Sequence, residues 1–292
     1  MERRPVGRIG SHRPARRRVP AVLVLVAALL VLTGCSAERV EQWQRGGLPV
    51  PASEESSIVG DLWNGAWIAA LIVGGITWFL ILFAALYYRR RSDQLPPQTR
   101  YNLPIEAFYT IAPVFVIAVL FYWTVVSQNE ILDDSAEPDL TVGVVGQQWS
   151  WAFNYAEAEV YDVGTAVEHP TLVLPVDQTV RFELRSPDVI HSFWVPGFYF
   201  KMDVIPGREN YFQLTPNREG TFAGKCAELC GAYHSRMLFN VEVVSAEEFE
   251  QHLEDLRDAG QTGEIEAPLR GAYDTEPLGP IPPLGSNVGS DE

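Results

Sequence analysis

The chain has 292 residues, of which 47% are apolar and unevenly spread, so a small soluble domain joined to membrane segments is favoured over one large soluble domain. Its formal charge is −15; because seven of the 22 basic residues lie before position 20, residues 35–292 alone carry 15 basic and 36 acidic side chains, a charge of −21. This charge argues against nucleic acid as a partner and suits a cationic protein, although it would also simply keep a domain soluble. Three cysteines are too few for a disulfide scaffold.

Residues 1–34 have the architecture of an export signal. Seven arginines precede the uncharged run Ala21–Leu32, which at 12 residues is too short to span a bilayer. The run ends in Leu32-Thr33-Gly34-Cys35, which resembles a bacterial lipobox, in which the cysteine becomes the lipidated N-terminus after cleavage. An ordinary signal or an uncleaved anchor with an incidental cysteine is the alternative. Residues 35–60 follow as an exported N-terminal segment.

Two uncharged runs predict a transmembrane helical hairpin over residues 61–130. Between Asp61 and Arg89 lie 27 residues, and between Glu106 and Glu130 lie 23. Both runs exceed the roughly 20 residues that a helix needs to cross a bilayer, and both have Trp and Tyr at their ends as interfacial anchors. Three consecutive arginines in the connection place it in the cytoplasm, so the N-terminus and the residues after 130 lie outside, as a lipidated cysteine also requires.

From Asp139 to Val244 the pattern changes to short alternating segments. Val180, Phe182 and Leu184 alternate with polar residues, which predicts a strand with one solvent-facing side. Similar runs occur at Leu140–Val145, Thr171–Leu174, Tyr211–Leu214 and Leu238–Val244. The pattern predicts an all-β sandwich or barrel of about 110 residues.

A helix is expected to close this domain, which would then span residues 131–260. Ser245 followed three positions later by Glu248 forms a capping box, which predicts an amphipathic helix that ends at Gly260. Residues 261–292 are rich in Pro, Gly and acidic side chains, so we expect a disordered tail.

The stretch that carries chemistry is Cys226-Ala-Glu-Leu-Cys230-Gly-Ala-Tyr-His234-Ser-Arg-Met237, with His191 located 35 residues before Cys226. Two thiolates, two imidazoles and a thioether are a soft set of donors suited to copper, whereas a zinc site would not use the methionine. Taken alone, the cysteine pair could form a disulfide and Met237 could fill a core. Their occurrence together in one short segment predicts a copper site.

The spacing Cys-x3-Cys-x3-His-x2-Met resembles the CuA loop of cytochrome c oxidase subunit II, and Asp188-Val-Ile-His191-Ser-Phe resembles the first-histidine loop of that family. The resemblance implies a membrane-anchored all-β protein, in which a two-helix transmembrane hairpin precedes a cupredoxin-like Greek-key β-sandwich. It also implies a dinuclear copper centre in the domain 131–260. The residues that it assigns to the two copper ions are His191, Cys226, Glu228, Cys230, His234 and Met237.

Within this implied centre, Cys226 and Cys230 bridge the two copper ions and each histidine binds one of them. Met237 and the backbone carbonyl of Glu228 are weak axial ligands. In this family the side chain of Glu228 also reaches a magnesium or manganese ion that is shared with subunit I.

Two further segments resemble the same family. Gln148-Trp149-Ser150-Trp151 is similar to the aromatic segment whose first tryptophan, here Trp149, accepts the electron from cytochrome c; a tryptophan by itself could equally be a core residue. Asn102-Leu-Pro-Ile-Glu106 is similar to the start of the second helix, whose glutamate lies at the mouth of a proton path into subunit I. Tyr109 stands where the family usually has tryptophan, and Glu106 alone could simply mark the end of a helix at the membrane surface.

The function that the resemblance implies is that of the electron-accepting subunit of an aa3-type cytochrome c oxidase in the bacterial cell membrane. The donor would be cytochrome c or a membrane-bound c-type haem subunit of a bc complex, and the partners would be subunits I and III and membrane lipid. The chain lacks the many-helix, histidine-rich core that would hold haem, so the oxygen-reducing, proton-pumping site would be on another subunit.

Three other classes share parts of the pattern. A Sco-type copper-delivery protein, the main alternative, has Cys-x3-Cys, a distant histidine and a membrane anchor, but its motif opens a thioredoxin-like fold. Quinol oxidase subunit II lacks the copper ligands. Nitrous-oxide reductase carries the same copper loop on a soluble chain, after a large propeller.

Overall fold

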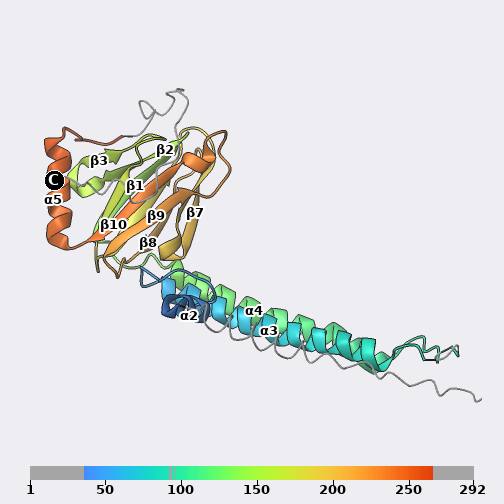
Figure 1. The fold of residues 1–292 in the computed structure, drawn as a ribbon. Coiled ribbons are helices and arrows are strands. Elements are labelled where there is room, and N and C mark those ends of the chain that lie inside the picture. Colours follow the sequence, from blue (N-terminus) through green and yellow to red (C-terminus); the bar gives the residue numbers. More distant parts are fainter. Residues whose placement is uncertain (1–35, 92–93, 96, 266–292) are drawn as a thin grey trace, which may run out of the picture. The chain divides into compact units, whose positions relative to one another are not determined.

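The computed structural model describes residues 36–91, 94–95 and 97–265 (Figure 1). The expected export signal, Cys35 and residues 266–292 of the expected tail lie outside the described residues. The first element among the described residues is the helix α2 (Ala37–Gln44), which the sequence analysis did not predict. It belongs to a unit of its own, and the unit that begins at Arg45 holds all the elements described below.

Two long helices, α3 (Ser56–Tyr87) and α4 (Leu103–Ile131), pack against each other as a hairpin. With 32 and 29 residues they are about 48 and 44 Å long, more than the roughly 30 Å of a bilayer's hydrocarbon core. Both are long and apolar enough to cross a membrane, as predicted. The start of α4 is fixed by Asn102, whose side chain accepts a hydrogen bond from the N–H of Ile105 (3.4 Å), and by a proline in the first turn.

Ten strands form two five-stranded sheets, with the orders β3-β2-β1-β5-β8 and β4-β10-β9-β6-β7. Neighbouring strands are antiparallel except for β1 with β5 and β4 with β10. Successive strands often change sheet, which gives the Greek-key β-sandwich of the cupredoxin-like fold that was expected (Figure 1). The strands are β1 (Leu140–Gln147), β2 (Ser150–Tyr155), β3 (Val160–Val163), β4 (Thr171–Pro175), β5 (Val180–Arg185), β6 (His191–Val195), β7 (Phe200–Val204), β8 (Asn210–Leu214), β9 (Gly220–Cys226) and β10 (Leu238–Val244).

Aromatic side chains fill the space between the two sheets. Trp151 of β2 contacts Phe239 of β10 with ring centroids 5.4 Å apart, and Phe193 of β6 stacks on Phe239 at 4.9 Å. Each is at most 2% exposed, so each contributes about 1.5–3 kcal/mol of hydrophobic stabilisation or more. The indole N–H of Trp151 also donates to the carbonyl of Met237 (3.4 Å), and its ring lies 6.2 Å from that of His191. The core is therefore continuous with the predicted metal ligands.

The helix α5 (Ala246–Asp258) packs on β3 and β4, which are edge strands of the two sheets. Its N-terminus has the predicted capping box. The hydroxyl of Ser245 accepts the N–H of Glu248 (3.3 Å), and the Glu248 carboxylate accepts the N–H of Ser245 (3.1 Å). The helix ends just before Gly260, whose φ of 77° is the left-handed conformation that glycine adopts readily.

Residues 261–265, which follow α5, are hydrogen-bonded to the sandwich although the sequence suggested a disordered tail from position 261. The N–H of Gly263 donates to the carbonyl of Glu159 (2.7 Å), and the side chain of Asn154 bonds both backbone groups of Ile265 (2.9 Å each). The Asn154 side-chain amide thus makes with Ile265 the two hydrogen bonds that the backbone of a neighbouring strand would make. Its partner lies far along the sequence, so local composition does not reveal this contact.

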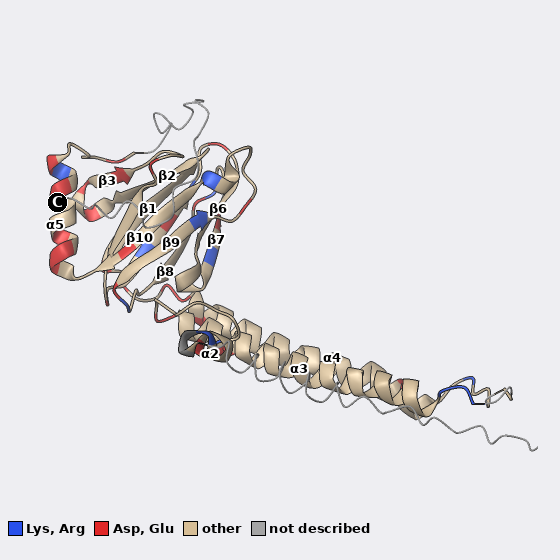
Figure 2. Ribbon diagram, viewed as in Figure 1, with Lys and Arg blue, Asp and Glu red and all other residues tan. Residues whose placement is uncertain are grey.

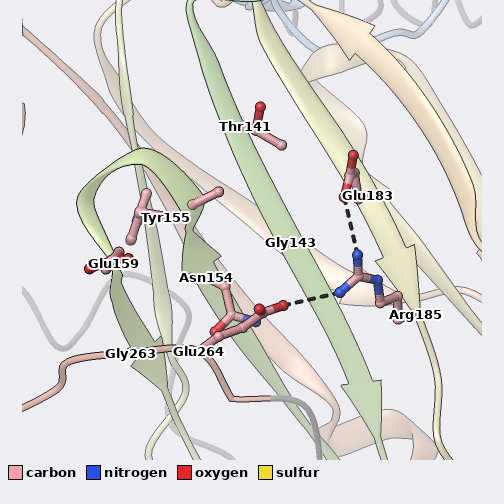
Figure 3. A pocket seen from close by; sticks show the side chains of 10 residues that line it. Thr141, Gly143, Asn154, Tyr155, Glu159, Glu183, Arg185, Gly263 and Glu264 are labelled. Carbon is pink, nitrogen blue, oxygen red and sulfur yellow. Dashed lines mark hydrogen bonds and ion pairs between the residues drawn. The ribbon is translucent and has the colours of Figure 1, made fainter.

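A cavity of about 410 Å³ lies between this segment and strands β1, β2 and β5 (Figure 3). Arg185 in its wall forms ion pairs with Glu183 (3.3 Å), Glu209 (2.6 Å) and Glu264 (3.0 Å). Three carboxylates therefore surround one guanidinium, which offers little attraction to a further anion. The residues that line the cavity include no cysteine, histidine or methionine, so the predicted copper chemistry does not belong here.

Residues 49–55, which precede α3, also contact the sandwich. The N–H of Ala52 donates to the carbonyl of Gly197 (2.9 Å), the N–H of Asn217 donates to the carbonyl of Ala52 (3.1 Å), and Arg218 donates to the carbonyl of Pro51 (3.1 Å). Ala52, with its neighbour Ser53, is at most 1% exposed. Part of the packing of the β-domain therefore comes from a segment that precedes the hairpin. Experiments on the domain should use the full chain.

Candidate metal centre

The register of β6 and β9 brings the two predicted ligand segments together. His191 begins β6 and Cys226 ends β9, and these antiparallel strands place Phe193 opposite Cys226. The loop that follows, residues 227–237, contains the short 3₁₀ turn η3 (His234–Arg236) and returns the chain to β10. This loop carries the remaining predicted copper ligands.

Three side chains converge on the two neighbouring cysteine sulfurs. The Sγ of Cys226 lies 3.9 Å from the Sγ of Cys230 and 3.9 Å from the Nδ1 of His191. The Sγ of Cys230 lies 3.6 Å from the Nδ1 of His234 and 3.7 Å from the Sδ of Met237. The structure thus brings together all the side chains that the sequence assigned to copper.

The backbone of Glu228 lies beside these side chains. Its carbonyl oxygen lies 3.2 Å from the Sγ of Cys226, on the loop between the two cysteines. Its side chain is exposed. The two roles that the resemblance gave to this residue therefore fall on separate groups of atoms.

Both cysteines are free thiols and are at most 5% exposed. Their sulfurs are 3.9 Å apart, about twice the roughly 2.05 Å of a disulfide bond, so the disulfide interpretation does not describe this structure. His191 and Met237 are fully buried. The group is a soft donor set at the edge of the aromatic core, buried except for the partly exposed His234.

The two thiols titrate as a pair. The hydrogen bond between the sulfurs, together with the one from His191, lowers the pKa of Cys226 to about 3 although burial opposes this. The same sulfur–sulfur contact, with burial and the charge on Cys226, raises the pKa of Cys230. The pair therefore loses its first proton easily, and a metal ion bound between the sulfurs would displace the second.

His191 is held in place by Asp188. Its Nε2 lies 2.9 Å from the Oδ1 of Asp188, which leaves Nδ1 facing Cys226. Burial lowers the pKa of His191, but the hydrogen bonds to Cys226 and Asp188 outweigh it and raise the pKa overall. A carboxylate on the outer nitrogen of a histidine is the usual support of a metal ligand. The sequence motif contains Asp188, but no role was predicted for it.

Among the described residues, one group of three or more His, Cys, Asp and Glu side chains could hold a metal ion, namely His191, Cys226 and Cys230. His234 and Met237 extend it on the side of Cys230. The donors fit copper because thiolate, imidazole and thioether are soft ligands, and because Asp188 occupies the Nε2 of His191 and leaves its Nδ1 available beside Cys226.

Trp149 lies beside this centre, whereas Glu106 does not. Trp149 is half-buried in the two-residue turn between β1 and β2, and its neighbour Gln148 donates from its side chain to the carbonyl of Cys230 (2.5 Å). Glu106 is in the first turn of α4, where its carboxylate accepts the N–H of Asn102 (2.8 Å). It is separated from Ile131, at the end of the helix that leads to β1, by most of the length of α4.

A membrane hairpin followed by a cupredoxin-like sandwich with a buried thiol–imidazole–thioether cluster defines a two-pass membrane protein of the cupredoxin-like class. The family model for the periplasmic domain of cytochrome c oxidase subunit II matches residues 140–244. The probable cytochrome c oxidase subunit 2 of Streptomyces avermitilis is 48% identical over 88% of this chain and 92% of its own length. Cytochrome c oxidase subunit 2 of Mycobacterium tuberculosis is 32% identical, over 87% of this chain and 86% of its own. This chain belongs to the cytochrome c oxidase subunit 2 family.

The comparison with solved structures also finds a similar protein. The crystal structure of the periplasmic domain of subunit II of cytochrome oxidase of Bradyrhizobium japonicum is 30% identical, over 42% of this chain and 97% of that chain, with a TM-score of 0.40. As a member of its family, the present chain is a subunit of an oxidase complex and has other oxidase subunits as partners. Its His/Cys/Cys group is consistent with copper binding.

Proposed function

We propose that this chain is the electron-accepting subunit of an aa3-type cytochrome c oxidase and that it binds two copper ions. The observation that carries the proposal is the convergence of two imidazole nitrogens and a thioether on two buried thiols, all at 3.6–3.9 Å. Cys226 and Cys230 would bridge the two ions, and His191 and His234 would each bind one. Met237 and the carbonyl of Glu228 would be the weak axial ligands.

The copper pair, when bound, supplies a one-electron redox couple whose charge is shared by both metals. The chain contributes rigidity and the burial of most of the ligands. Trp151 packs behind His191, Asp188 fixes its ring, and the ligand loop returns directly into β10. Because these groups are held by the sandwich, little rearrangement is needed when one electron arrives from the donor and one leaves, with no bond made or broken.

The proposed donor is cytochrome c or a membrane-bound c-type haem subunit of a bc complex, and the proposed acceptor is subunit I, assembled with subunit III. The chain is acidic overall, with acidic residues frequent along α5 (Figure 2), and this charge suits a cationic donor. The exposed carboxylate of Glu228 would face a magnesium or manganese ion shared with subunit I, and Glu106 would stand at the mouth of a proton path in that subunit.

A Sco-type copper-delivery protein is the alternative function. Its cysteine pair opens a thioredoxin-like fold, whereas Cys226 here ends a strand of a β-sandwich and Cys230 follows in the loop. A histidine four positions after Cys230 and a methionine three further on also lie in contact with that sulfur. These features support the electron-transfer function over metal delivery.

Rapid mixing of the purified oxidase complex with reduced cytochrome c tests the proposal. The absorbance of the copper pair should bleach before any haem of the complex is reduced. A complex assembled with Cys226→Ser is the control and should show no such early phase. Haem reduction that starts at full rate without prior loss of the copper absorbance would contradict the proposed function.

We also propose that residues 1–34 are removed, that Cys35 is lipidated, and that the β-domain lies on the extracytoplasmic side. Intact mass of the mature protein should give Cys35 as the first residue with a diacylglycerol adduct. Since one lipid adds little to two spans, Cys35→Ala should stay in the membrane but be processed poorly, whereas Ser36→Ala should mature normally. A mature N-terminus elsewhere would refute the lipid anchor.

A further inference from the structure

We propose that Tyr233 is a positioning residue, whose ring holds the indole of Trp149 against the loop that carries Cys230 and His234. The inference rests on the proposed function, because that function gives Trp149 its role as the side chain through which the electron enters. It assigns to Tyr233 the task of keeping this indole at a fixed separation from the copper ligands.

The two rings form an edge-to-face pair. The ring centroids of Trp149 and Tyr233 are 5.0 Å apart with an interplanar angle of 88°, the arrangement that aromatic pairs favour. Tyr233 immediately precedes the ligand His234 in the chain. The contact therefore joins the turn between β1 and β2, in one sheet, to a ligand loop that connects two strands of the other sheet.

Gly231 forms the other side of the packing site of the Trp149 indole, which we call the seat. Its φ is 132°, and a Cβ added there would lie 3.1 Å from the Nε1 and 3.2 Å from the Cζ2 of Trp149. The indole therefore lies directly against the backbone of Gly231, the residue after Cys230. Trp149 thus touches the loop on two sides, and each contact is one residue away from a proposed copper ligand.

Packing alone fixes the orientation of this indole. The Nε1 of Trp149 is buried and has no hydrogen-bond partner among the described residues. A buried N–H without a partner weakens the hold on a side chain, so the ring depends on the shapes of Gly231 and Tyr233 around it. Electron transfer becomes slower as the gap between redox groups widens. Loss of the Tyr233 ring should therefore slow electron uptake without removing any ligand.

Fluorine nuclear magnetic resonance of the metal-free full chain tests the seat directly. The chain, labelled with 5-fluorotryptophan, has eight tryptophans, and Trp149→Phe identifies the resonance of Trp149 by its disappearance. Tyr233→Leu should shift and broaden this resonance and leave the other seven unchanged. Tyr233→Phe should retain it. Tyr211→Leu, at an exposed tyrosine on β8, is the matched control and should not move it.

The copper-loaded oxidase complex gives the second readout. Tyr233→Leu should leave the copper content and the copper spectrum unchanged. It should lower the rate of reduction by cytochrome c about two- to tenfold, because loss of an edge-to-face pair reduces by about that factor the population of molecules whose indole is held against the loop. Tyr233→Phe should restore the rate. Gly231→Ala should lower it too, because the added Cβ would crowd both the indole and the side-chain amide of Gln148.

An unchanged Trp149 resonance in Tyr233→Leu would overturn the inference, as would Tyr233→Leu and Tyr233→Phe with equal rates. The proposed function fails in a different way. One such outcome is that Trp149→Gln does not slow electron uptake while, in an otherwise wild-type background, the Trp149 resonance still responds to Tyr233→Leu. That result would support the contact between Tyr233 and Trp149 and refute the role of Trp149 in electron entry.

Discussion

Cys226→Ser is expected to abolish the copper pair, whereas Met237→Leu is expected to leave it in place with an altered redox potential. The Sγ of Cys226 lies near Cys230, His191 and the carbonyl of Glu228. It therefore connects the His191 side of the centre to the Cys230 side. A thiolate neutralises charge on both metals, and a serine hydroxyl in its place is poorly ionised and hard. The delocalised spectrum should vanish completely.

Met237 contacts only one side of the centre, through Cys230 (3.7 Å). An axial thioether contributes a long, weak bond and mainly tunes the redox potential. Met237 is fully buried, but leucine has a similar volume, so the packing loss should stay below about 1.5 kcal/mol. The hydrogen bond from Trp151 to residue 237 uses the backbone carbonyl and should persist.

Copper stoichiometry of both variants in the full chain decides between these outcomes. Ser235→Ala, at an exposed position in the same loop, is the control and should bind copper as the wild type does. If Met237→Leu lost both coppers as fully as Cys226→Ser, the axial role of Met237 would be wrong.

Trp149→Gln is expected to slow electron uptake from cytochrome c severely while copper content and donor binding stay near normal. Trp149 occupies a two-residue turn, half-buried, against a loop with proposed ligands on both sides, and it packs on the core from outside the fully buried cluster. Its removal should therefore interrupt the path of the electron more than the fold. Stopped-flow reduction of the variant oxidase complex measures the effect.

Trp194→Gln is the matched control for this experiment. Trp194 is a half-buried tryptophan of β6 that packs under the ammonium group of Lys225 (4.4 Å), and it has no proposed part in electron transfer. Unchanged kinetics in Trp149→Gln would refute the role of Trp149. Lost copper in that variant would instead favour its being a structural residue of the core.

Much of the site could be predicted because its signals are local. The spacing of Cys226, Cys230, His234 and Met237 falls within one loop, and the capping box at Ser245 and the two apolar spans depend only on neighbouring residues. The structure places the ligand loop, the helix α5 and the two apolar helices at the residues where the sequence predicted them.

The supporting contacts could not be predicted because they join distant segments. Gln148 and Cys230 are 82 residues apart, and Tyr233 meets Trp149 only because β1 and β9 lie in different sheets that face each other. Residues 49–55 show no periodic pattern, and Ala52 is buried in the core of the sandwich, with its backbone hydrogen-bonded to Gly197 and Asn217. The Asp188–His191 contact is closer in sequence, but it depends on a turn whose geometry residue types alone do not fix.

Copper analysis of the metal-loaded full chain in detergent, combined with electron paramagnetic resonance, tests the central claim most directly. The geometry around Cys226 and Cys230 predicts two copper ions per chain and a mixed-valence signal from one electron shared by both metals. A single copper per chain with a mononuclear blue-copper spectrum would contradict the dinuclear centre.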